Sequence, residues 1–210
     1  MPSSCNYEAI TLRTSDVGEA DRFCIFFTRD RGRLAARANA VRRPGSKSGA
    51  LLLPLRHAIV ELVETSSGFI VRSAALPEDH VPPPTGVRDF AMATEGTELL
   101  LLLLEDDEPI VPLFDATLHF LAACGSAPHA SLGFTFCLLR HLGFLPDLRS
   151  SFFEECDASE NIFLEKAVRG EFSQLPPVPN PARLNNIADY FLRDHLQRER
   201  KANAVAAILS

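Results

Sequence analysis

The sequence lacks the cysteine pairs that mark a disulfide framework or a zinc ribbon. Its five cysteines are widely scattered, and none stands in a CxxC pair.

A long apolar run is also missing. The most apolar run, Leu99–Leu104, has six leucines, whereas a bilayer-spanning helix needs about 20 residues. The first residues show no basic segment followed by an apolar one, so no secretory signal is predicted. These absences favour a soluble cytoplasmic protein with reduced thiols, in which the leucine run is a buried helix.

No arrangement of catalytic residues is legible either. The segment GSKS at 45–48 superficially resembles a phosphate-binding loop, but the residue before Lys47 is serine and the further glycine of that motif is absent. Cys137 and His141 lie four residues apart on a predicted helix, where a cysteine packed as a small apolar residue is a simpler interpretation than a metal or nucleophile site. We therefore expect no catalytic residue, no metal and no cofactor, and a protein that is not an enzyme.

Positive charge is scarce overall but concentrated in one segment. The net charge is −6, yet the stretch from Arg22 to Arg56 holds nine basic residues and one acid, Asp30, a balance of +8. The rest of the chain must therefore carry −14. Because local charge governs contact with a polyanion, a basic surface is expected on an otherwise acidic protein.

The periodicity divides the chain into a β part and a helical part. Residues 1–76 show five short strand-like segments, some alternating and one strongly apolar, joined by tight connections, which favours an OB-fold barrel. The segment 77–88 contains three consecutive prolines and is predicted to be a linker. Residues 89–210 show helical patterns. The predicted fold class is α+β multidomain, an N-terminal OB-fold β-barrel followed by an all-α domain.

Acidic clusters flank the ends of predicted helices. One helix is expected to begin at an N-cap Ser159, and the last to run from about Ala182 to Leu209. The clusters at 105–108 and 154–160 lie next to such ends. We interpret them as solvated caps rather than as acid–base or metal-binding pairs.

One surface of the barrel is expected to gather the cations. If residues 33–41 form a strand, Arg33 and Arg37 project to the same face, while Ala36 and Ala38 face the core. The turn before this strand and the loop after it add further cations. Such a surface suits a phosphate backbone, although a solvated face with no ligand is the alternative. The predicted nucleic-acid-binding residues are Arg29, Arg31, Arg33, Arg37, Arg42, Arg43, Lys47 and Arg56.

The order of several segments resembles the bacterial RecO family of recombination mediator proteins. The shared features are the GEADR…TRDRG pairing at 18–32, the RRPGSKS loop at 42–48 and the LLRHLGFLPDL segment at 138–148. The resemblance implies an OB-fold that binds single- and double-stranded DNA, attached to a helical domain. It also implies strand annealing at the nucleoid and action with RecR, which helps RecA load onto DNA coated with single-stranded DNA-binding protein (SSB).

The chain departs from that family where many relatives carry a four-cysteine zinc module. That module would follow residue 148, and the only cysteine close to this place in the sequence is Cys156. Ser151 and Glu154 stand about where the first two zinc ligands would be. The zinc module is therefore interpreted as lost.

The family's pocket for the C-terminal tail of SSB lies on the helical domain. That tail carries acidic residues followed by a short apolar end, so a pocket for it needs an apolar surface with a cation at its rim. We predict the pocket here at Phe136, Leu139, Arg140 and Leu142. The alternative function is a protein-interaction adaptor that acts through the acidic helical domain and binds DNA weakly.

Overall fold

The chain folds into two compact units, Met1–Gly125 and Ser126–Ser210. A computed structural model describes residues 4–209, with side chains described as far as residue 196. The units divide after Gly125, beyond the proline-rich segment 77–88, because the first two helices pack with the barrel.

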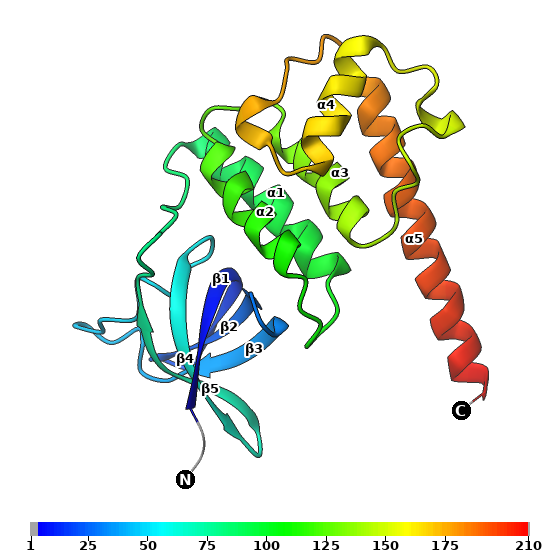
Figure 1. The fold of residues 1–210 in the computed structure, drawn as a ribbon. Helices are drawn as coiled ribbons and strands as arrows, with labels where there is room; N and C mark the ends of the chain where they lie inside the picture. The colour runs from blue at the N-terminus through cyan, green and yellow to red at the C-terminus, as the bar shows by residue number, and fades with distance from the viewer. Residues whose placement is uncertain (1–3, 210) are drawn as a thin grey trace. The chain divides into compact units, whose positions relative to one another are not determined.

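The first unit contains a closed barrel of five strands (Figure 1). Around the barrel the order is β1-β2-β3-β5-β4; β3 and β5 are parallel, and the other neighbours are antiparallel. This OB-like barrel confirms the predicted fold class. The strands are β1 Ser4–Val17, β2 Asp21–Thr28, β3 Gly32–Ala38, β4 His57–Thr65 and β5 Gly68–Ala75.

The barrel interior follows the alternation of the sequence. In β3, Leu34, Ala36 and Ala38 are buried while Arg37 is exposed, as the period of two predicts. Phe26 of β2 is also fully buried in this core. The following residue, Phe27, points to the opposite side and is still fully buried, because a helix covers the outside of the barrel there.

That helix belongs to a pair, α1 Val87–Leu103 and α2 Val111–Ala123, which lie side by side (Figure 1). The α2 residue Phe114 meets the Phe27 ring edge-on, with centroids 5.4 Å apart. Within the leucine run, Leu100, Leu103 and Leu104 are buried but Leu102 is 53% exposed. The run therefore goes around a helix that is buried on one side and exposed at Leu102, rather than a helix buried on all sides.

The loop between α1 and α2 is attached to the β2–β3 turn. Asp106 accepts a hydrogen bond from Arg33 Nε at 2.6 Å, and Asp107 pairs with Arg31. Gly32 has φ 64°, and a Cβ there would lie 2.2 Å from the carbonyl oxygen of Glu108, so only glycine allows this approach. The carboxylates of Asp106 and Asp107 are 73% and 54% exposed, as solvated groups at a helix end would be, but they also pair with barrel arginines, which the sequence did not predict.

A chain of polar contacts fastens α2 to the outside of the barrel. Glu8 accepts from His57 Nε2 at 3.0 Å and from Arg29 Nε at 2.6 Å. Arg29 also pairs with Asp115 of α2 at 2.7 Å and lies over the Phe114 ring at 4.8 Å. We call Glu8, Arg29, His57 and Asp115 the barrel–helix clasp.

The tautomer of His57 in this clasp follows from its second contact. The backbone N–H of Val81 donates to His57 Nδ1 at 3.2 Å, so the neutral ring keeps its proton on Nε2 and donates it to Glu8. Burial lowers the pKa of His57 below the usual 6.5. Protonation would also place an N–H opposite that of Val81.

We therefore expect stability to fall as the pH is lowered below about 6.5, where an unfolded histidine takes up a proton that His57 in the fold does not. The contribution is fully present above the unfolded pKa and is lost as the pH falls to the lowered folded pKa. Urea unfolding between pH 5 and 8 measures this. His57→Gln should flatten the slope, leaving the part due to His141, whose pKa burial also lowers. An unchanged slope in that variant would contradict the prediction.

The second unit is helical, with α3 Ala130–His141, α4 Ala158–Val168 and α5 Ala182–Leu209 (Figure 1). Short 3-10 helices cover Ser151–Phe153 and Phe172–Gln174. The N-cap of α4 is Asp157, which forms a capping box with Glu160. The predicted N-cap at Ser159 is wrong, because the reciprocal bonds need the acid three residues before Glu160. In the part of the chain that the structure describes, no helix is long and apolar enough to cross a membrane.

Candidate nucleic-acid interface

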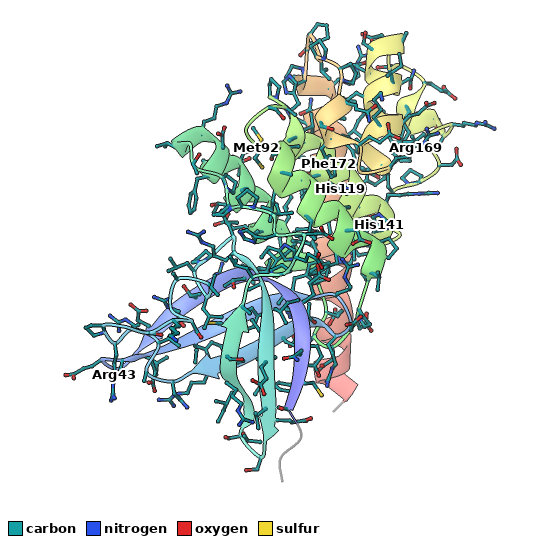
Figure 2. All side chains as sticks on the ribbon, turned by 60° about the vertical axis from the view of Figure 1, so that its left-hand side comes forward. Arg43, Met92, His119, His141, Arg169 and Phe172 are labelled. Atoms are coloured by element: carbon teal, nitrogen blue, oxygen red, sulfur yellow. The ribbon has the colours of Figure 1, made fainter. Side chains whose placement is uncertain are left out.

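The loop between β3 and β4, residues 39–56, carries three exposed cations of the barrel. Val41 and Leu52 of this loop are buried in the barrel core, whereas Arg42, Arg43 and Lys47 are exposed. Figure 2 shows Arg43 far out on this loop. No helix or strand forms between residues 39 and 56, so β3 ends at Ala38 and the expected strand over 33–41 is three residues too long at its end. We call Arg37, Arg42, Arg43 and Lys47 the basic loop surface.

The predicted cations do not gather on one surface. Arg29, Arg31 and Arg33 lie at the β2–β3 turn, whereas the basic loop surface lies at the other end of β3. The seven residues of β3 separate the two ends by about 20 Å at about 3.3 Å per residue. Arg56 is half-buried before β4, whose first residue pairs with Ile10 near the helix-covered end. The expectation of one continuous patch is therefore wrong.

The two groups also differ in how far carboxylates neutralise them. Arg29, Arg31 and Arg33 are each paired with an acid of the α1–α2 region, and Arg33 Nη1 also donates to the Leu101 carbonyl at 2.7 Å. The positive charges of these three arginines are therefore neutralised by carboxylates of the first unit.

At the other end, fewer carboxylates oppose the cations. Arg37 pairs with Asp21 at 2.7 Å, and Arg42 lies 3.3 Å from Asp16. Among the described residues, Arg43 and Lys47 form no ion pair or side-chain hydrogen bond. The basic loop surface therefore keeps positive charge available for a ligand.

The outer face of β1, β2 and β3 adds an aromatic ring to this surface. The cross-strand pairs place Phe23 between Ser15 and Arg37, and its side chain is 39% exposed. Arg13 is exposed on the same stretch of β1. Sequence reasoning did not identify either residue as a site residue. The signal for Phe23 was available, because the turn at 28–32 fixes the β2–β3 register and puts Phe23 opposite Arg37.

Nucleophilic and metal chemistry find no support in the described residues. Burial raises the pKa of Cys137 to about 12, that of Cys124 to about 12 and that of Cys24 to about 11. Such thiols are unreactive at neutral pH. Among the residues that the structure describes, no group of three or more His, Cys, Asp or Glu side chains could hold a metal ion. Cys156 therefore has no set of further metal ligands beside it. The absence of zinc stays a prediction.

The residues predicted to bind the SSB tail divide into core and surface. Phe136 and Leu139 are fully buried among the other helices of the second unit. They cannot contact a partner in the folded unit, so their assignment to a binding surface is wrong. The reason is that α3 is buried without a break from Leu132 to Leu139. Leu142 is half-buried.

Arg140 is exposed and lines a hollow of about 320 Å³. Leu148 and Val168 supply apolar surface there, and Arg149 supplies a second cation. Asp147, Asn161 and Glu165 complete the lining.

Comparison with known proteins places nearly the whole barrel and most of the helical part in one family. Residues 1–74 match the sequence profile described as "Recombination protein O N terminal", and residues 87–176 match "Recombination protein O C terminal".

Curated relatives agree with these profiles. The chain is 37% identical over 128 residues to a DNA repair protein RecO of Nocardioides sp., covering 59% of this chain and 51% of the relative. It is 35% identical over 163 residues to a DNA repair protein RecO of Streptomyces griseus, covering 71% of this chain and 63% of the relative. For the DNA repair protein RecO of Heliobacterium modesticaldum the identity is 34% over 143 residues, covering 67% and 52%. The chain thus spans between half and two thirds of the length of these three relatives. On both profiles and these matches, the chain belongs to the RecO family.

Proposed function

We propose that the protein is a non-enzymatic recombination mediator that binds and anneals DNA strands at the nucleoid. With RecR it helps load RecA onto single-stranded DNA coated with SSB. The observation that carries the proposal is the basic loop surface on an OB-like barrel in a chain of the RecO family. Both single- and double-stranded DNA are expected ligands, because phosphate contacts do not depend on strand number.

The arrangement suits a ligand that is read by its backbone and not by its sequence. Four cations on a loop and an adjoining strand can follow a line of phosphates. Phe23, beside Arg37, offers a ring on which an unpaired base can stack. No further base-reading side chain is needed for annealing, which must accept every sequence.

Strand annealing with and without SSB tests this function. The protein should accelerate pairing of complementary strands, and it should still do so when both strands are covered by SSB. The alternative, an adaptor with weak DNA binding, is favoured by the neutralisation of Arg29, Arg31 and Arg33. An adaptor would bind SSB and leave the rate of annealing of bare strands unchanged, and that result would overturn the proposal.

For the acidic tail of SSB, the hollow at Arg140 is the surface that we propose. Arg140 and Arg149 can pair with carboxylates, and Leu148 and Val168 can contact the apolar end of the tail. The tail would lie on the surface of the second unit, outside the core that contains Phe136 and Leu139.

Arg140→Glu is expected to weaken binding of an SSB-tail peptide by about tenfold, the loss typical of one charged hydrogen bond. Fluorescence anisotropy with the labelled peptide measures it, and binding to bare DNA should not change. Arg169→Glu is the matched control, because Arg169 is also exposed and also at a helix C-terminus but does not line the hollow. Equal peptide affinity in both variants would place the tail elsewhere.

A further inference from the structure

Two consecutive residues of β2 fix the base of the β3–β4 loop. Asp21 Oδ1 accepts a hydrogen bond from the backbone N–H of Ala40 at 2.8 Å, where the loop leaves β3. Arg22 Nη1 donates to the carbonyl oxygen of Gly49 at 3.1 Å, on the returning side of the loop. Arg42, Arg43 and Lys47 lie between these two points of the chain.

The two sides of the loop touch at this base. A Cβ on Gly49 would lie 2.4 Å from the carbonyl oxygen of Val41, so the two backbones are in direct contact. Val41 itself is packed in the barrel core. Residues 42–48 are therefore a short excursion closed at its base, and the base decides where its cations stand.

The base contains an unfavourable backbone conformation. Ala40 has φ 55°, in the left-handed region that a residue with a Cβ adopts at a cost. The N–H of this same residue is the one that Asp21 holds, and that bond is the largest cause that lowers the pKa of Asp21. The backbone N–H of Arg42 is bonded to the Ala20 carbonyl at 3.0 Å, so the same turn fixes the next residues as well.

The second oxygen of the same carboxylate orients a cation. Asp21 Oδ2 accepts from Arg37 Nη2 at 2.7 Å and from Arg37 Nε at 3.1 Å. A carboxylate on a DNA-binding surface repels phosphates. If Asp21 acted through its charge alone, its removal would strengthen DNA binding.

We propose that Asp21 is a positioning residue of the candidate nucleic-acid interface. Its carboxylate holds Ala40 and Arg37, and thereby presents the cations of the basic loop surface in a fixed arrangement before DNA arrives. Such preorganisation removes the cost of ordering the loop on binding. This inference rests on the proposed DNA-binding function and assigns a role to a residue that does not itself contact phosphate.

Four variants of the full chain separate position from charge, with binding to a labelled single strand as the measurement. Asp21→Ala loses the bond to Ala40 and should weaken binding about fivefold, equivalent to about 1 kcal/mol, although it removes a negative charge. Asp21→Glu keeps the charge but displaces the oxygen, and should weaken binding as well. Asp21→Asn keeps an acceptor for Ala40 and should bind at least as tightly as the original protein.

Asp16→Ala is the matched control. Asp16 lies on the same β1–β2 hairpin and near Arg22 and Arg42, but its carboxylate accepts no backbone hydrogen bond from the residues that the structure describes. Its removal should leave binding unchanged or strengthen it.

The proposal is overturned if Asp21→Ala binds as tightly as Asp16→Ala, or if Asp21→Glu binds like the original protein. Should Asp21→Ala not fold by circular dichroism, the comparison of the Glu and Asn variants decides alone. A variant with Arg42, Arg43 and Lys47 all changed to glutamate distinguishes failure of the positioning role of Asp21 from failure of the proposed DNA-binding function of the loop. If that variant retains full DNA binding, the proposed function of the loop is at fault, and the role of Asp21 falls with it.

Discussion

Changing Arg42, Arg43 and Lys47 together to glutamate is expected to weaken DNA binding by on the order of a hundredfold at 0.1 M salt. These three side chains are exposed, and none of them contributes to the barrel core. Because the proposed contacts are with phosphates, which every sequence carries, the loss should be the same for every sequence. The slope of log affinity against log salt should fall by about two units, since each single-strand contact contributes about 0.7. Titrations of labelled strands at several salt concentrations measure both effects.

A matched variant tests whether position matters or only net charge. Arg88, Arg169 and Arg193 are also exposed arginines, and their change to glutamate alters the net charge equally. It should reduce affinity far less and leave the salt slope almost intact. Equal losses in the two variants would mean that the basic loop surface is not the site, and that DNA responds to overall charge.

Arg29→Ala is expected to lower the free energy of unfolding by about 2 kcal/mol, between the values for exposed and buried ion pairs. The side chains of Arg29 and Glu8 are only 28% and 25% exposed. Without the guanidinium, Glu8 is left beside the buried His57, Asp115 loses its partner, and the contact over Phe114 disappears. Urea unfolding at pH 7.5 measures the change.

The same variant tests whether Arg29 acts in the barrel–helix clasp or on the DNA-binding surface. DNA binding by the folded protein should remain close to normal, because the charge of Arg29 is already neutralised by Glu8 and Asp115 in the barrel–helix clasp. Arg72→Ala is the control, since Arg72 is 67% exposed and lies 3.7 Å from Glu61; it should cost less than about 0.5 kcal/mol. Normal stability of Arg29→Ala with weakened DNA binding would return Arg29 to the DNA surface.

The sequence by itself determined the elements and the fold class. A continuous apolar run marked β2, whereas alternation of apolar residues marked part of β1 and all of β3, because a strand exposes successive side chains to opposite sides. In β3 it gave both the buried alanines and the outward Arg37. Proline and glycine marked only residues 42–49 of the irregular loop 39–56, since neither residue continues a regular element, and the flanking residues 39–41 were expected to extend β3. The start of α5 at Ala182 followed in the same way from its apolar stripe.

Only the tertiary structure decided what each charged or aromatic side chain does. Arg31 and Arg33 look the same in sequence as Arg42 and Arg43, but their partners, Asp107 and Asp106, lie more than seventy residues away. No local pattern shows such a pairing, because it depends on where the α1–α2 loop passes over the barrel.

Which side chains of the second unit are buried was also decided only by the tertiary structure. Phe136 and Leu139 are spaced as a surface stripe would be, but α3 has neighbours on several sides and buries them all. Asp21 has no sequence motif that marks it, since its two acceptors serve residues 16 and 19 positions further on. Periodicity records which residues avoid water, whereas contacts between distant segments depend on how the elements pack together.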